Sequence, residues 1–167
     1  MVLDRTDHRV DIGPAGRNLF ISRDKQLQSR QAKRLRRAKQ FLETVIENIP
    51  GGFFRYSNDE KLEFDHISEG FLKLIGHSRD SFKETYGNRF DNLVHPEDRK
   101  RVFDSINRQI KRSDYDMVEY RVTKADGRIL WLFDKAQLVH DENGRSWFYV
   151  IVMDITSLRK TQQELKI

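Results

Sequence analysis

The sequence predicts an α+β domain with five strands, three of which form an antiparallel meander near the C-terminus. Two hairpin signals, Asp126-Gly127 and Asn143-Gly144, separate runs rich in β-branched and aromatic residues over 117–123, 129–139 and 146–154. Apolar residues recur at helical spacing in the middle of the chain. The length of 167 residues, 37% of them apolar, is enough for one core and too short for two full domains.

Shorter elements precede the meander within a body that spans residues 50–155. Two short strands and two short helices come first, expected over 53–56, 62–67, 71–75 and 80–86. Pro96 stands at the first position of a longer helix that runs to about residue 112. Acidic residues follow Pro96 in the first turn, where the helix dipole favours negative charge.

A basic amphipathic helix is expected over residues 24–49, which contain no Gly or Pro. Leu35, Leu42 and Ile49 recur every seven residues with Val45 between them, a spacing typical of a coiled-coil seam. The first half of this helix is polar, so we expect the helix to pair with a partner helix or to dock on the body.

The basic charge of the chain is concentrated in its two arms. Residues 1–40 hold 11 Lys or Arg against 4 Asp or Glu, whereas residues 41–155 hold 17 against 21 and residues 156–167 hold 3 against 1. Such an arm can contact nucleic acid or a membrane surface, but a solvated linker helix has the same composition and is preferred. Residues 1–23 show no sustained periodicity and are expected to be a flexible leader.

Several classes of protein are excluded by composition. Because the chain has no cysteine, it has no disulfide, thiolate zinc site, thiol nucleophile or cysteine-held iron cluster. The longest apolar run, residues 147–153, is far shorter than the ~20 residues of a membrane-spanning helix. No signal peptide is recognisable, and we expect a soluble, cytoplasmic protein.

The last predicted strand is apolar on both faces. A sheet with one buried face would alternate apolar and polar residues, so we expect the N-terminal helix or a second subunit to cover the other face. Trp131 and Trp147, on adjacent strands, are expected to be largely shielded. The two sides of the last strand carry Trp147, Tyr149, Ile151 and Met153 on one and Phe148, Val150 and Val152 on the other.

Five stretches in sequence order resemble the PAS domain family. They are FLETVIENIPGGFFRY, LIGHSRDSF, LVHPEDRKRV, EYRVTKADGRILW and DENGRSWFYVIVMDIT, which lie within residues 41–156. The resemblance implies a PAS fold, with a five-stranded antiparallel sheet and short helices on one face. It also implies that residues 24–49 are a signalling helix and that residues 156–167 begin a C-terminal linker helix.

Little in the sequence indicates a metal or a prosthetic group. No two of the five histidines are spaced i, i+4, which disfavours zinc. Haem-binding PAS relatives carry their ligand in the helix after His95, where this chain has no histidine, and the flavin-like stretch Gly87-Asn88-Arg89-Phe90 lacks the cysteine of light-sensing relatives. We therefore predict no metal, haem or flavin, and leave open an unidentified small molecule.

Catalytic motifs are absent as well, and the chain is not expected to be an enzyme. It has no Gly-rich phosphate loop, nucleophile elbow or kinase motif. Glu119 and Arg121 form the family's E-x-R pattern, which usually supports the sheet and sometimes reaches an anion; the structural role is preferred. Asp154, Ile155 and Thr156 resemble the family's exit motif, which fixes the angle at which the chain leaves the sheet.

The resemblance implies a sensory and dimerisation module that forms a homodimer. Such a module passes a signal through its flanking helices to an output domain, such as a histidine kinase or a diguanylate cyclase. The output domain is expected in the same polypeptide or in a signalling partner. One alternative is a ligand-free dimerisation module, because the residues that would line a pocket are also those that a filled core needs. Nucleic-acid binding through the basic helix is a further, disfavoured alternative. The pocket candidates are Phe54, Phe64, Phe71, Leu74, Val102, Ile106, Tyr120, Leu132 and Val150.

Overall fold

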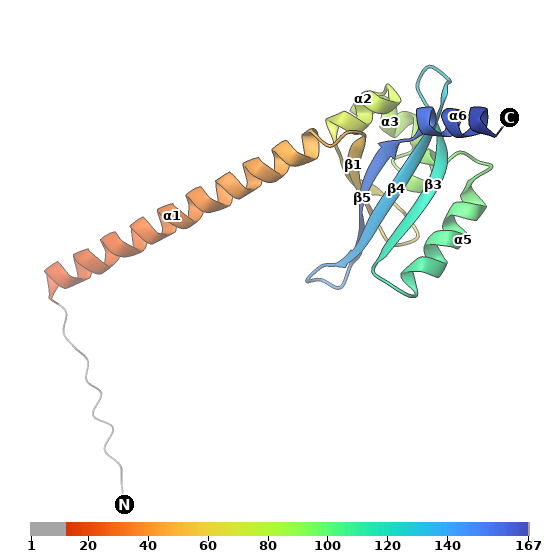
Figure 1. Cartoon of the computed structure of the whole chain (residues 1–167). Helices are drawn as coiled ribbons and strands as arrows, with labels where there is room; N and C mark the ends of the chain where they lie inside the picture. Colours follow the sequence, from red (N-terminus) through yellow and green to blue (C-terminus); the bar gives the residue numbers. More distant parts are fainter. Residues whose placement is uncertain (1–12, 167) are drawn as a thin grey trace, which may run out of the picture. The chain divides into compact units, whose positions relative to one another are not determined.

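A computed structural model describes residues 13–166 and confirms the predicted α+β class (Figure 1). Two units, residues 1–43 and residues 44–167, make most of their contacts internally and are described separately. No helix in the described part of the chain is both long and apolar enough to cross a membrane.

The first unit is dominated by one helix, α1 (Pro14–Glu47), none of whose residues is buried. Its start at Pro14 corrects the expected flexible leader for residues 14–23, while residues 1–12 lie outside the described part. The fixed φ of proline suits the first position of a helix, and a glycine at position 16 costs only ~1 kcal/mol there. The helix therefore begins at Pro14, directly after Gly13.

The sheet of the second unit has five antiparallel strands in the order β2-β1-β5-β4-β3. The meander is confirmed, and its two connecting turns place Gly127 and Gly144 at positive φ, which only glycine adopts without strain. Because β5 pairs with β1, the chain's last strand lies at the centre of the sheet. The strands are β1 (Gly52–Ser57), β2 (Phe64–Ile67), β3 (Tyr115–Thr123), β4 (Ile129–His140) and β5 (Ser146–Asp154).

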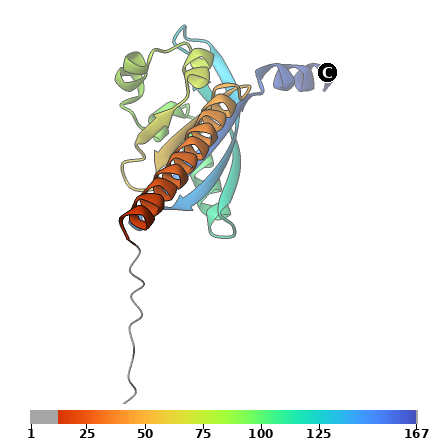
Figure 2. The ribbon, with the colours of Figure 1, turned by 90° about the vertical axis from the view of Figure 1, so that its left-hand side faces the viewer.

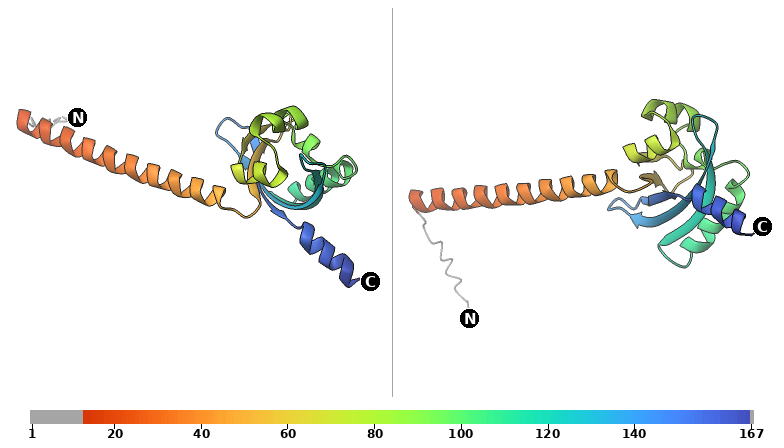
Figure 3. Two further views of the ribbon diagram at one scale, coloured as in Figure 1. Left: turned by 90° about the horizontal axis from the view of Figure 1, so that it is seen from above. Right: turned by 45° about the horizontal axis from the view of Figure 1, so that its top comes forward.

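Four helices cover the inner face of this sheet, which curves around them in Figure 3. Ser68 accepts a hydrogen bond from Phe71 N at the start of the first of them, and Gly76 ends it in the left-handed conformation. A sixth helix, α6 (Thr156–Leu165), leaves the sheet on the side away from α2 and α3 (Figure 2). The four inner helices are α2 (Glu69–Ile75), α3 (Arg79–Tyr86), α4 (Phe90–Leu93) and α5 (Arg99–Ile110).

Two details of these helices differ from the sequence prediction. Helix α5 begins at Arg99 and not at Pro96, because residues 96–98 form a turn in which the Asp98 carboxylate binds Arg121 on β3. The α4 turn, residues 90–93, was not predicted; Phe90 and Leu93 of this turn are both buried in the core.

Aromatic rings fill the space between the helices and the sheet. Tyr56 lies between two of them, with its ring centroid 4.2 Å from Phe90 and 5.0 Å from Phe148. Helix α2 approaches β1 so closely that a Cβ atom on Gly52 would lie 2.5 Å from Cβ of Phe71. Glycine at position 52 is thus required for the contact between α2 and the sheet.

The outer face of the sheet is accessible, and Trp131 and Trp147 lie on it, so their expected shielding is only partial. Both are half-buried on this face, because odd-numbered residues of β4 and β5 point away from the helices. Arginine side chains partly cover them: the Arg145 guanidinium lies 4.7 Å from the Trp147 ring centroid, and that of Arg159 lies 3.5 Å from the Trp131 centroid.

Replacing Phe54 should show which face holds the core. Phe54 is fully buried against the rings of Phe64 and Phe71, so Phe54→Ala is expected to lower the free energy of unfolding by ~3–5 kcal/mol. Urea unfolding measures this loss. Phe41→Ala, at a position on α1 that is 68% exposed, serves as the control and should change it by less than ~0.5 kcal/mol. Equal losses for both variants would contradict the assignment.

Candidate functional site

The inner face of the sheet carries four polar side chains among apolar ones. Asp116 and Tyr120 lie on β3, Asp134 on β4 and Tyr56 on β1, and we call these four the core acid cluster. In the β3–β4 register Asp116 is opposite Ala136 and Asp134 is opposite Val118, so the two acids are diagonal neighbours on one face. Residues in a diagonal pair are close enough that a charge on one affects the ionisation of the other.

The two acids differ in their hydrogen bonds. The Tyr120 hydroxyl donates to Oδ2 of Asp134 over 2.7 Å, and Asp134 is only 2% exposed. Asp116 is 0% exposed, and neither of its carboxyl oxygens has a hydrogen-bond partner among the described residues. A buried carboxyl without a partner is expensive when ionised, because water solvates the charge far better than an apolar core does.

Burial raises the pKa of the Asp116 carboxyl to about 6. It also raises the pKa of Asp134 well above its usual range, with a further contribution from the nearby charge of Asp116 and an opposing one from the Tyr120 hydroxyl. The pKa values of the Tyr56 and Tyr120 hydroxyls are raised as well, mainly by burial. The cluster therefore disfavours negative charge and can accept a proton or a hydrogen-bond donor.

All nine predicted pocket residues contribute to the same core. Eight of them are buried, and Leu74 is partly buried against the others. They pack against one another, as the rings of Phe54 and Phe71 do at 5.1 Å between centroids. A groove of 520 Å³ lies elsewhere, on the outer face, lined by Phe53, Tyr115, Met117, Lys135, Ala136, Gln137, Tyr149 and Ile151.

Asp116, Asp134 and Tyr56 were not among the predicted site residues. Their signal is present in the strand alternation, since Val118 and Val122 point inward on β3 and Asp116 falls on the same side. An acidic residue at an inward-facing position of a strand is rare without a functional or structural partner. The sequence analysis considered Glu119 but no acid at an inward-facing strand position, and so it missed Asp116 and Asp134.

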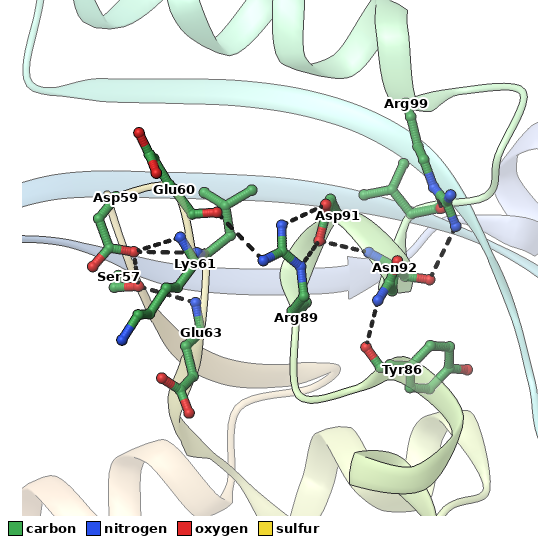
Figure 4. Close-up of polar contacts among 12 residues, drawn as sticks. Ser57, Asp59, Glu60, Lys61, Glu63, Tyr86, Arg89, Asp91, Asn92 and Arg99 are labelled. Atoms are coloured by element: carbon green, nitrogen blue, oxygen red, sulfur yellow. Dashed lines mark hydrogen bonds and ion pairs between the residues drawn. The ribbon is translucent and has the colours of Figure 1, made fainter.

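A polar network closes the helical side of the core (Figure 4). The Arg89 guanidinium donates two hydrogen bonds to the Asp91 carboxylate, at 3.0 and 2.9 Å, and one to the Glu60 carbonyl at 3.3 Å. The bond to Arg89 is also the largest influence that lowers the pKa of Asp91. The arginine of the flavin-like stretch is thus engaged by an acid of the same chain. Nearby, the Asn92 amide donates to the Tyr86 carbonyl at 2.9 Å.

The turn between β1 and β2 is fixed in a similar way. Oδ1 of Asp59 accepts from the Ser57 hydroxyl at 2.8 Å and from the backbone N–H groups of Lys61 and Leu62 (Figure 4). These bonds hold Leu62 at φ 48°, which is uncommon for a branched residue. The turn supports the side of the core next to Arg89, because the backbone N–H of Phe90 donates to the Leu62 carbonyl.

The exit from the sheet is held by short hydrogen bonds. Oδ1 of Asp154 accepts from the Thr156 backbone N–H at 2.9 Å and from the Thr156 hydroxyl at 2.6 Å. The Thr156 hydroxyl oxygen in turn accepts from the Trp131 backbone N–H at 3.0 Å, and Ile155 N donates to the Trp131 carbonyl. The three predicted junction residues therefore join α6 to strand β4.

Two further residues hold α6, and the sequence analysis missed one of them entirely. Arg159 donates to Oε2 of Glu119 at 2.5 Å while its guanidinium lies over the Trp131 ring. Glu119 belongs to the E-x-R pattern, whose arginine, Arg121, donates two hydrogen bonds to Asp98 at 2.7 and 3.1 Å. Burial opposes ionisation of Asp98, but the bonds to Arg121 outweigh it and lower the pKa of Asp98.

Metal ligation finds no support in the described residues. Within residues 13–166, no three acidic or histidine side chains converge so that they could hold a metal ion.

Removing Arg159 should loosen α6 without unfolding the sheet. The Glu119 ion pair is partly exposed and is worth ~0–1 kcal/mol, and the contact with Trp131 adds ~0.5–1 kcal/mol. In Arg159→Ala we expect faster amide exchange in α6 and unchanged exchange in β4. Lys160→Ala, at the exposed neighbouring position, is the matched control. Unchanged exchange in α6 of Arg159→Ala would show that this side chain does not hold the helix.

The chain matches a known family in sequence and known structures in fold. The sequence model of the family described as the PAS fold matches residues 64–153, more than half of the chain. No curated protein matches the chain in sequence.

Solved structures with this arrangement are numerous, and three are representative. A sensory box histidine kinase/response regulator from Burkholderia thailandensis is 20% identical with a TM-score of 0.57, over 75% of this chain and 92% of that one. An RNA-binding light-oxygen-voltage receptor is 16% identical with a TM-score of 0.60, over 77% and 36%. The PAS domain of an HTR-like protein from Haloarcula marismortui is 21% identical with a TM-score of 0.56, over 76% and 99%. At these identities the similarity shows the fold alone.

Proposed function

Since this chain belongs to the PAS fold family, we propose that it is a sensory and dimerising input module of a cytoplasmic signalling protein. A change in the core of the domain alters the seating of α6, and α6 passes that change to an output domain such as a histidine kinase or a diguanylate cyclase. The output domain belongs to the same polypeptide or to a signalling partner, and the chain itself has no catalytic role.

One observation carries this proposal: of two neighbouring residues on β3, one makes a hydrogen bond in the core and the other makes one to the exit helix α6. Tyr120 points inward and binds Asp134, while Glu119 points outward and binds Arg159 of α6. On β4, Leu132 lies in the core and its neighbour Trp131 bonds Thr156 at the start of α6. A small shift of either strand changes both sets of contacts, and a difference of a few kcal/mol between two arrangements is enough to switch populations.

Exposed apolar surface supports the dimerising part of the proposal. We call Phe53, Tyr115, Met117, Tyr149, Ile151 and Met153 on the outer face of the sheet the outer patch. All but the half-buried Phe53 are exposed, and five of the six line the 520 Å³ groove. On α1 the seam residues Leu35, Leu42 and Val45 are exposed too, Leu35 by 73%. The fourth predicted seam residue, Ile49, lies beyond Glu47, where α1 ends, and so is not part of the helix. Apolar patches of this kind commonly mark interaction sites.

The packing of the core favours a second candidate, a dimerisation module without a ligand. The predicted pocket residues pack on one another, and the groove on the outer face does not include them. Native mass spectrometry of the purified chain distinguishes the candidates. A co-purifying small molecule supports the sensor, whereas a dimer with no bound molecule supports the ligand-free module.

Replacing Asp154 tests the transmission of the signal. With an output domain fused after Ile167, Asp154→Ala should change output activity, while the lost junction hydrogen bonds cost only ~1 kcal/mol of global stability. Lys61→Ala, at an exposed position far along the chain from the junction, is the control. If both variants signal like the parent protein, Asp154 is only a helix cap and the transmission model fails.

Assembly is tested by Ile151→Lys, which places a charge in the outer patch at a position that is 45% exposed. Because charge is depleted from the centre of stable interfaces, we expect the dimer to dissociate at least tenfold more readily in sedimentation experiments, with the thermal unfolding of the domain nearly unchanged. Deletion of residues 1–40 should weaken the dimer as well. A variant chain that sediments like the parent dimer would exclude this face.

A further inference from the structure

Asp116 is an acid that the rest of the core does not neutralise. It is completely buried, and neither carboxyl oxygen has a partner among residues 13–166. Ionising such a group costs several kcal/mol unless a cation or several hydrogen-bond donors face it. The other buried carboxyl groups of the described chain do have partners: Asp98 is bound by Arg121 and Asp134 by the Tyr120 hydroxyl. Asp116 is therefore the one buried acid among residues 13–166 whose carboxyl oxygens have none.

The surroundings of Asp116 contain no positive charge. Strand β1 contributes Tyr56, β3 contributes Tyr120 and β4 contributes Asp134, and these are the titratable groups that act on one another in this part of the core. The buried side chains of α5 and β5 are apolar, such as Val102 and Ile106 of α5 and Val150 and Val152 of β5. No lysine, arginine or histidine of the described chain contributes to the pKa of either acid.

Asp134 is a second buried acid on the same face of the sheet as Asp116. One of its carboxyl oxygens accepts a hydrogen bond from the Tyr120 hydroxyl. Asp134 lies diagonally across the β3–β4 ladder from Asp116. Two carboxylates on one buried face repel each other when both are ionised. The pair therefore titrates as a unit and holds at least one proton more readily than either acid does alone.

We propose that Asp116 and Asp134 form a proton-binding site within the core, so that a proton is itself a ligand that this domain senses. This deepens the proposed function, on which its link to signalling rests, because it names what occupies the core. A proton needs no cavity, which suits a core in which the large side chains already pack on one another.

The sign of the pH dependence follows from the two states of Asp116. Its pKa is about 6 in the folded protein and about 3.9 in an unfolded chain, so between these values the folded state binds more protons. The stabilisation is complete below about pH 4 and is lost as the pH rises through about 6. For this one carboxyl, the folded-to-unfolded ratio should fall about tenfold between pH 5 and pH 7.5.

The test uses the full chain and compares two variants over this pH range. Asp116→Asn has nearly the same shape and cannot ionise, so its folded-to-unfolded ratio in urea should fall about tenfold less than that of the parent chain, because only the contribution of Asp134 remains. Asp114→Asn, an exposed acid two positions away, should keep the decrease seen in the parent chain. A parent and an Asp116→Asn variant with the same pH dependence would overturn the proposal.

A second measurement covers the case in which Asp116→Asn does not fold. In the parent chain, the ¹³C carboxyl resonance of Asp116 should titrate near pH 6, and a midpoint near 4 would overturn the proposal. The signalling link is separate: fused output activity that changes with pH in the parent and not in Asp116→Asn supports it. A proton that binds while Asp154→Ala leaves the output unchanged would leave the site standing and overturn the proposed function.

Discussion

Strands β3 and β4 pair without interruption from Tyr115 opposite Gln137 to Thr123 opposite Ile129, and the rest of the structure depends on this register. Alternation along each strand sends one residue into the core and the next to the outer face. A slip of one residue would move Asp116 and Asp134 to the outer face of the sheet. It would also turn Arg121 of β3 and Trp131 of β4, which now point outward, into the core. The turn at Gly127, which requires a positive φ, fixes the register at one end.

The same register explains why the core combines tight packing with unsatisfied charge. Rings from β1, α2 and α4 pack around Phe54 and Tyr56, and this excludes water from the inner face. Without water, an acid can remain only if it is hydrogen-bonded or neutral. Asp134 accepts a hydrogen bond from the Tyr120 hydroxyl, whereas Asp116 has no partner among the described residues, so ionisation is opposed by burial at both acids and is uncompensated at Asp116.

Outward-facing residues divide the outer face into two regions with different properties. Near α6, the tryptophan of β4 lies under arginines, and the Glu119–Arg159 ion pair ties the exit helix to the sheet. Toward the other end of β3 and along β5 the side chains are apolar and accessible, and they form the outer patch. The exit helix and the outer patch therefore share one face of the sheet, and in the proposed function a partner that packs on the patch would contact the same strands that hold α6.

Local chemistry in the sequence determined most of the secondary structure. The two Gly-containing turns define the meander, Ser68 and Gly76 delimit α2, and period-two patterns identify the strands. The residues of the exit junction were predicted from their resemblance to the PAS family, and the hydrogen bonds from Thr156 to Asp154 join positions only two apart. Likewise, the predicted pocket residues do lie in one core, since apolar residues with regular spacing have few other places to go.

Only the tertiary structure decided which face of the sheet the helices cover and which residues the charged side chains contact. Trp131 and Trp147 were expected to be shielded, yet the helices pack on the opposite face. Arg159 reaches Glu119 across 40 positions of sequence, and Asp116 meets Asp134 only because two strands pair in one register. Contacts of this kind depend on strand order and layer packing, which are non-local, whereas turns and caps depend on neighbouring residues and can be recognised in the sequence alone.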